Sequence, residues 1–313
     1  METIVKPDSC VSALNSAAVT NLSSEHFSAP LEGGFVDGTL IHRGSFSKLA
    51  TLVPGYFGIE RGYKPLARLL VELDDELAVA TFEPLRCQPQ RGLWTSEFVS
   101  PLLVPHRLLG QSARAVTEHV AKTHSGIEEV SLIGHSTGGP GALNAANHSS
   151  LIVHNVILLA SAGVTGHNAL SLALKAPIVL WEGLSNHDRL VANLGEEPAY
   201  FFLNSVHDLV HYAFTNPLRT SGEALAVGQC NAMKNVKRAR ALGIKVGGLF
   251  INNDAFFPGD VAKRMVSSDL DSFICLGSDM GHLAPQTHTS EIAATLHVQL
   301  AELGKLATAK AIA

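Results

Sequence analysis

Apolar residues in this chain form short strand-like runs that alternate with stretches in which they recur every three to four positions. The strand-like runs lie at residues 35–42, 48–53, 77–82, 128–133, 153–160, 245–251 and 273–276. Between two of them, Leu66, Leu69, Leu70 and Leu73 have the i, i+3, i+4, i+7 spacing of one buried helix face. The same spacing, or a high alanine content, predicts further helices at residues 109–120, 139–147, 261–266 and 292–303.

Two segments interrupt this alternation. Residues 1–28 are rich in Ser, Ala and Asn without periodicity, which predicts a loosely ordered N-terminal lead-in. Residues 163–229 are helix-like and rich in Leu, Ala and aromatic residues, which indicates a helical cap insertion. The core is then residues 29–162 and 230–313. Its repeated strands and helices, joined by short connections, predict an α/β fold with a doubly wound, mostly parallel sheet.

The composition indicates a compact globular protein, and the charge favours small-molecule chemistry. The 313 residues are 46% hydrophobic and 16% charged, so the chain can bury a large core. The net charge of -5 is modest and no run of like charges occurs, so a nucleic-acid partner is not expected.

Cysteine usage and the N-terminus favour a cytoplasmic protein. Cys10, Cys87, Cys230 and Cys275 are far apart and form no CxxC motif, so we expect reduced thiols. No stretch has the length and apolar character of a membrane span, and the N-terminus does not follow the pattern of a secretory signal.

A serine flanked by glycines follows one predicted strand directly and precedes a predicted helix. This stretch reads Gly134-His135-Ser136-Thr137-Gly138. The glycines allow a tight turn that exposes the serine hydroxyl above the carboxyl end of the strand. The start of the helix also offers the Thr137 N–H to an oxyanion formed beside Ser136. The context therefore favours Ser136 as a nucleophile over a serine that merely caps a helix.

A serine nucleophile needs a base, and the base needs an acid partner. His282 follows the last predicted strand and Asp254 follows the strand before it, so both belong to the sheet edge that carries Ser136. Asp260 and Asp279 are the alternative acids, and His288 is the alternative base. Loop boundaries predicted from one sequence are uncertain by several residues, so these alternatives stay open.

The order nucleophile, acid, histidine at the ends of successive strands resembles the α/β-hydrolase superfamily over residues 35–305. The resemblance implies a catalytic triad of Ser136, Asp254 and His282 within the segments GHSTG, NNDAFFP and MGHLAP. It also makes Gly134, His135 and Gly138 the nucleophile elbow. In that family the oxyanion hole takes a second N–H from a loop often written His-Gly-x, and here Pro54-Gly55-Tyr56 stands in its place. The resemblance thus assigns the oxyanion hole to the backbone of Tyr56 and Thr137.

Departures from the family's motifs make some of the family's activities less favoured for this chain. The family's epoxide hydrolases and dehalogenases usually use an aspartate nucleophile where this chain has Ser136, and the segment Glu83-Pro84-Leu85-Arg86 lacks their Asp-x-x-Gly-x-Gly-x-Ser pattern. The residues Gly139-Pro140-Gly141-Ala142 differ from the Gly-Leu-x-Ala-Arg of bacterial true lipases, so a long-chain lipase is not favoured.

The sequence therefore predicts an esterase that cleaves a carboxylic ester through an acyl-enzyme, without a cofactor. The apolar cap predicts a small-molecule substrate with an apolar acyl or alcohol group. Thioesterase, lactonase, C–C hydrolase and acyltransferase activities use the same triad, and a non-hydrolytic ligand receptor on this fold is a further alternative. His207, Asp208 and His211 have metal-like spacing but lack a third ligand of clear placement, so no metal site is predicted. The oligomeric state stays open.

Overall fold

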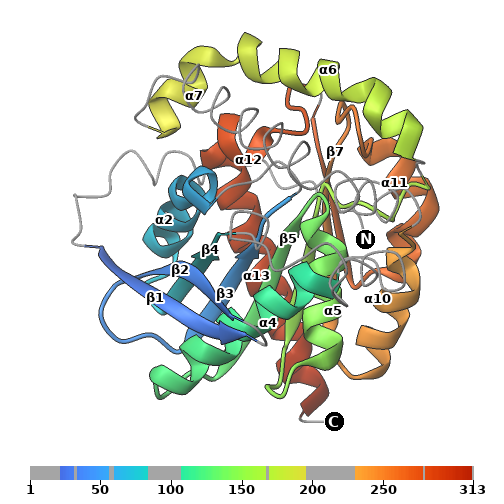
Figure 1. Cartoon of the computed structure of the whole chain (residues 1–313). Helices are drawn as coiled ribbons and strands as arrows, with labels where there is room; N and C mark the ends of the chain where they lie inside the picture. The colour runs from blue at the N-terminus through green and yellow to red at the C-terminus, as the bar shows by residue number, and fades with distance from the viewer. Residues whose placement is uncertain are drawn as a thin grey trace.

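The structure is a computed structural model, and it describes residues 22–31, 34–55, 60–83, 107–166, 169–194, 230–277 and 279–311. Its centre is an eight-stranded sheet (Figure 1). The strands are β1 (Ser23–Leu31), β2 (Gly34–His42), β3 (Lys48–Val53), β4 (Leu77–Phe82), β5 (Glu129–His135), β6 (Asn155–Leu159), β7 (Lys245–Ile251) and β8 (Ser272–Leu276). They lie in the order β1-β2-β4-β3-β5-β6-β7-β8.

Six of these strands run parallel to one another. Strands β1 and β2 form an antiparallel pair, and β2 also pairs with β4 in antiparallel fashion. From β4 through β3, β5, β6 and β7 to β8, every pairing is parallel. The predicted doubly wound, mostly parallel sheet is confirmed. Parallel strands bring all their carboxyl ends to one edge, and loops at that edge form the functional site in such sheets.

Helices cover both faces of the sheet (Figure 1). They are α2 (Lys64–Leu73), α4 (Arg107–Thr123), α5 (Gly138–His148), α6 (Ala169–Ser185), α7 (His187–Leu194), α10 (Ala232–Ala241), α11 (Gly259–Val266), α12 (Ala284–Thr287) and α13 (Thr289–Ala311), with the 3-10 turns η1 (Glu60–Tyr63) and η3 (Ser267–Asp269). Helices α4, α5 and α10 pack together on one face, and α2 and α13 pack together on the other.

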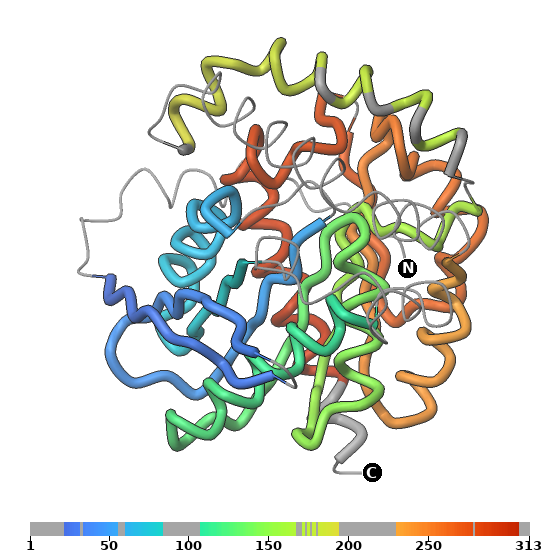
Figure 2. Tube along the Cα trace, viewed as in Figure 1, coloured from blue at the N-terminus to red at the C-terminus, as the bar shows by residue number. Residues whose placement is uncertain are grey.

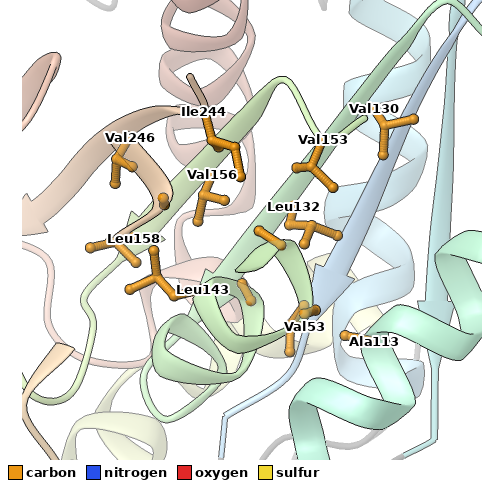
Figure 3. Packing of buried hydrophobic residues seen from close by; sticks show 14 of the residues in the cluster. Val53, Ala113, Val130, Leu132, Leu143, Val153, Val156, Leu158, Ile244 and Val246 are labelled. Atoms are coloured by element: carbon orange, nitrogen blue, oxygen red, sulfur yellow. The ribbon is translucent and has the colours of Figure 1, made fainter. Parts of the chain in front are cut away.

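Each central strand is mostly apolar because it contributes to two cores at once. Successive side chains of a strand point to opposite faces. Leu132 and Leu158 therefore pack with α5 in one buried cluster (Figure 3). Their chain neighbours Ile133 and Ile157 pack in the other cluster with α2 and α13. This two-sided burial explains why the strands are recognised from continuous apolar runs rather than from alternation.

Most strands and helices agree with the sequence prediction, but the predicted N-terminal lead-in extends too far along the chain. The strands predicted at 48–53, 77–82 and 245–251 are confirmed with the same bounds. The loosely ordered lead-in was predicted to reach residue 28, but residues 23–28 belong to β1. This strand is mostly exposed and pairs through its backbone with β2, so its side chains carry little apolar alternation. Residues 1–21 lie outside the described part of the chain.

Helices α6 and α7 occupy the stretch between β6 and α10 where a helical cap was expected. They pass over the carboxyl ends of the central strands (Figure 2). Asn193 of α7 donates to the carbonyl of Gln286 at 2.8 Å, so the described part of the cap touches α12. Residues 195–229, which include His207, Asp208 and His211, lie outside the described residues.

Two further findings concern properties expected from the sequence. No helix in the described ranges is both long and apolar enough to cross a membrane.

Cys230 and Cys275 are free thiols, and burial raises the pKa of Cys230 to about 12. Cys10 and Cys87 lie outside the described residues.

Truncation of a side chain between α5 and the sheet tests the packing. Leu143 is fully buried on α5 (Figure 3). We expect Leu143→Ala to lower the free energy of unfolding by about 2–5 kcal/mol, because it removes apolar contacts and leaves a cavity. Leu242, which is 59% exposed, is the matched control, and Leu242→Ala should change the unfolding free energy by less than about 0.5 kcal/mol. Equal losses in urea unfolding would contradict the assigned core.

Candidate active site

Ser136 lies in a strained turn between β5 and α5. Its φ of 55° is in the left-handed region, which non-glycine residues seldom adopt. Three backbone hydrogen bonds stabilise the turn. Its N–H donates to the carbonyl of Leu159 at 3.0 Å, and its carbonyl accepts from the N–H groups of Gly139 and Ala162 at 3.2 and 2.9 Å. The neighbouring backbone therefore determines the conformation that directs the serine hydroxyl.

The glycines around Ser136 are required by close backbone contacts. A Cβ added at Gly134 would lie 2.3 Å from the carbonyl oxygen of Gly138, and one added at Gly138 would lie 2.1 Å from the carbonyl oxygen of Val53. Any side chain at either position would separate the turn from β3 or from its own helix.

The structure brings Ser136, His282 and Asp254 together in one hydrogen-bonded chain. The Nε2 atom of His282 lies 3.1 Å from the Oγ of Ser136, and its Nδ1 atom lies 2.8 Å from the Oδ2 of Asp254. The carboxylate only accepts, so Nδ1–H donates to it and Nε2 is left to accept from the serine hydroxyl. All three residues are buried. Asp254 follows β7 and His282 follows β8, and both loops lie at the edge that carries Ser136.

Asp254 keeps its negative charge although it is buried. Burial alone would raise its pKa, but the neighbouring His282 and two backbone donors outweigh this effect and leave the pKa below its ordinary value. The donors are the N–H groups of Phe256 and Phe257, which lie 2.7 and 2.9 Å from Oδ1. Because Oδ1 is occupied in this way, Oδ2 faces the histidine.

Aromatic rings fix the orientation of the His282 ring. Phe256 and Phe257 pack edge-on against it, with ring centroids 4.8 and 5.5 Å away. The His135 ring lies on another side, at 4.9 Å. The imidazole therefore has little freedom to turn away from Ser136.

His135 links three parts of the site. Its Nε2–H donates to the carbonyl of His282 at 3.0 Å, and its Nδ1 accepts from the Tyr63 hydroxyl at 2.7 Å. That hydroxyl in turn accepts from the N–H of Gly55 at 3.2 Å. Burial lowers the pKa of His135 to about 3, and the nearby His282 contributes to this shift, so the ring is neutral. In the sequence His135 is only the residue before the serine, and nothing local indicates these contacts.

Thr137 and Tyr56 are the two residues whose N–H groups were predicted to form an oxyanion hole. Thr137 is the N-cap of α5, so helix geometry leaves its N–H without an intrahelical acceptor. Tyr56, the other predicted donor, lies outside the described residues. Its neighbour Gly55 packs against Ser136, because a Cβ added at Gly55 would lie 2.9 Å from the Cβ of Ser136.

Glu182 of α6 contacts the loop that carries His282. One carboxylate oxygen accepts from the N–H of His282 and the other from the N–H of Leu283, each at 2.9 Å. Burial raises the pKa of Glu182, and the nearby Asp254 carboxylate adds to this effect, although the N–H donors and His282 oppose it. The one acidic residue within the apolar segment 169–185 was the available signal for this contact, and sequence reasoning missed it.

The alternative acids and base lie elsewhere. Asp260 pairs with Arg264 on the exposed surface of α11, and Asp279 is exposed in the turn before His282. His288 is buried, with Nδ1 2.9 Å from the Thr287 hydroxyl. Within the part of the chain that the structure covers, no group of three or more His, Cys, Asp or Glu residues could hold a metal ion.

Comparison with known proteins identifies the fold. No protein-family model matches the sequence, and no curated protein does either. Solved structures do resemble it. The proline iminopeptidase of Mycobacterium smegmatis has a TM-score of 0.61 at 13% identity, covering 90% of this chain and 100% of that one. The bromoperoxidase of Bacillus anthracis has a TM-score of 0.60 at 14% identity, covering 88% and 99%. The protein has the α/β-hydrolase fold.

A thermophilic esterase from Thermogutta terrifontis is similar in the same way, with a TM-score of 0.58 and 14% identity over 89% of this chain and 99% of that one. An esterase, a peptidase and a peroxidase thus share the α/β-hydrolase fold with this chain. The fold does not select among these reactions, so the reaction must be argued from the site.

The buried His135 predicts how stability depends on pH. Its folded-state pKa of about 3 lies below the ordinary value of 6.5. At acidic pH the unfolded chain therefore binds a proton that the folded chain does not, and the unfolding free energy falls with pH from about 6.5 down to about 3. Between about pH 7 and pH 5 this amounts to about 2 kcal/mol.

Replacement of this histidine should remove that part of the pH dependence. In His135→Gln the amide can still donate to the His282 carbonyl, but the residue does not titrate. We expect urea unfolding at about pH 7 and pH 5 to show a smaller loss for the variant than for the wild type. His187→Gln, at an exposed position, is the control and should behave as the wild type. Parallel losses in wild type and His135→Gln would show that His135 titrates normally in the folded protein.

Proposed function

We propose that the protein is a serine hydrolase that cleaves a carboxylic ester with an apolar acyl or alcohol group. The observation that carries the proposal is the chain from Ser136 Oγ through His282 to Asp254, with contacts of 3.1 and 2.8 Å. Nucleophile, base and orienting carboxylate lie within hydrogen-bonding reach, as acyl transfer requires. The strained turn at Ser136 supports the same function, because backbone strain of this kind is concentrated at functional sites.

The first half-reaction forms an acyl-enzyme. Ser136 Oγ attacks the ester carbonyl while His282 Nε2 takes its proton, and the ionised Asp254 stabilises the imidazolium. The N–H groups of Thr137 and Tyr56 donate to the oxyanion of the tetrahedral intermediate, and each such donor contributes a factor of about 100 to 1000 in kcat. The intermediate collapses when His282 returns the proton to the leaving alcohol.

The second half-reaction releases the acid. Water enters beside the acyl group, and His282 takes a proton from it as the oxygen attacks the acyl carbonyl. A second tetrahedral intermediate collapses, the bond to Ser136 Oγ breaks, and His282 returns the proton to that oxygen. The free carboxylic acid leaves and the starting hydrogen-bonded chain is restored.

Apolar packing beside His282 supports an apolar substrate. Leu172 and Val179 of α6 pack in one cluster with Phe256, Phe257 and Leu283. Helix α6 carries two charged residues, Lys175 and Glu182, and the carboxylate of Glu182 already accepts two backbone N–H groups. A mostly apolar wall of this kind suits an acyl or alcohol chain and offers no clamp for a phosphate.

Covalent labelling tests the nucleophile. We expect a fluorophosphonate probe to add once to the wild type, at Ser136, as seen by intact mass and peptide mapping. Ser136→Ala should lose the adduct and lower kcat for p-nitrophenyl esters by more than about 1000-fold. Ser161→Ala is the matched control, since Ser161 is a buried serine near the turn whose Oγ donates to the Ala162 carbonyl. Full activity in Ser136→Ala would exclude Ser136 from the mechanism, and absence of any adduct would favour a ligand receptor.

A substrate series tests the specificity. With acyl chains of increasing length on one leaving alcohol, we expect kcat/KM to rise with each added methylene, by a factor of about 10 or more where the pocket is apolar, and then to fall when the pocket is full. Thioester, lactone and C–C substrates, and added acceptor alcohols, serve as competitors in parallel assays. If the acyl group were transferred to an added alcohol faster than to water, the protein would be an acyltransferase rather than an ester hydrolase.

A further inference from the structure

Helix α6 contributes one acidic side chain to the loop that carries His282. The Glu182 carboxylate lies 2.9 Å from the N–H of His282 and 2.9 Å from the N–H of Leu283. Residue 182 is 100 positions before His282 in the chain. No periodicity or turn signal requires this contact, which brings an element of the cap to the backbone of the predicted base.

Gly281 allows the carboxylate to approach. A Cβ added at Gly281 would lie 2.4 to 2.6 Å from the carboxyl atoms of Glu182, which is closer than real Cβ contacts. The loop thus has a glycine where the acid packs against it, followed by two donors at the next two positions. An ionised carboxylate accepts both bonds, whereas an amide of the same shape has one acceptor and one donor.

Both backbone groups of His282 have partners from other elements. Its N–H donates to Glu182, and its carbonyl accepts from Nε2 of His135. Asp254 accepts from its side chain. Among these partners Glu182 is the one that belongs to α6, so the position of α6 and the position of the histidine are mechanically linked.

We propose that Glu182 is a positioning residue that fixes the backbone of His282 within reach of Ser136 from helix α6. The proposal rests on the proposed function, because it concerns the base of that reaction. It implies that the base is correctly placed when α6 is docked on the loop. A shift of about 1 Å between reacting groups lowers rates by about 100-fold, so a contact of this kind can be decisive without touching the substrate.

Two substitutions disturb the contact from opposite sides. Glu182→Gln keeps the size of the side chain but places an amide donor against a backbone donor. Gly281→Ala leaves Glu182 intact and displaces its carboxylate. We expect each to lower both kcat and the rate of fluorophosphonate addition to Ser136 by about 10- to 100-fold, with KM changed less than about twofold.

The matched control is Glu118→Gln. Glu118 is also a carboxylate that accepts a backbone N–H, from Ser150 at 2.8 Å, but it lies on α4 and is not part of the site. It should label and turn over as the wild type does. A smaller active fraction would also lower the apparent kcat without changing KM. Thermal unfolding and the final extent of fluorophosphonate labelling therefore measure that fraction in every variant, and kcat is calculated per labelled site.

A spectroscopic readout separates this proposal from the proposed function. The Nδ1–H of His282 lies in a short hydrogen bond to Asp254 and should give a downfield proton resonance. We expect that resonance to shift or vanish in Glu182→Gln and Gly281→Ala and to persist in Glu118→Gln. Wild-type labelling rates in both site variants, with an unchanged resonance, would overturn the role of Glu182 and leave the hydrolase intact. If the wild type itself were never labelled, the hydrolase would fail and the resonance alone would decide the role of Glu182.

Discussion

The left-handed backbone of Ser136 is the constraint on which the rest of the site depends. Such a conformation costs a non-glycine residue about 1–3 kcal/mol and persists only where neighbours determine it. Here the neighbours are Leu159, Gly139 and Ala162, which take up the backbone hydrogen bonds of Ser136. The close approach of Gly138 to the end of β3 requires that no side chain intervene. The parallel sheet supplies this arrangement because β3, β5 and β6 are neighbours that end at the same edge.

Two buried residues that contact His282 have opposite charge states. His135 is neutral, because burial lowers its pKa and the nearby His282 lowers it further. Asp254 keeps its charge, because it accepts three hydrogen bonds, two from backbone and one from His282. In a low local dielectric an unpaired charge is costly, whereas the attraction between a charge and its hydrogen-bond partners is stronger. The sheet edge thus holds one neutral donor for the backbone of His282 and one ionised acceptor for its ring.

The sequence was sufficient to predict the core of the fold and the polar residues that follow its strands. Apolar runs located β3, β4 and β7 because both faces of those strands are buried. The meeting of Ser136, Asp254 and His282 then followed from the rule that parallel strands end at one edge. The edge strand β1 was not predicted, because it is held by backbone pairing with β2 and its mostly exposed side chains show no apolar alternation. The contacts of His135 and Glu182 were not predicted, because they join residues 72 to 147 positions apart and the partner of each depends on packing.

The order of the elements also determines when the site can exist. Ser136 and His282, whose Nε2 accepts from the serine hydroxyl, lie 146 positions apart in the chain, and His282 follows the last strand of the sheet. While the chain is being synthesised, β5 and its turn leave the ribosome well before β7 and β8. Between the synthesis of Ser136 and that of His282, the serine hydroxyl therefore lacks the imidazole that it contacts in the folded protein.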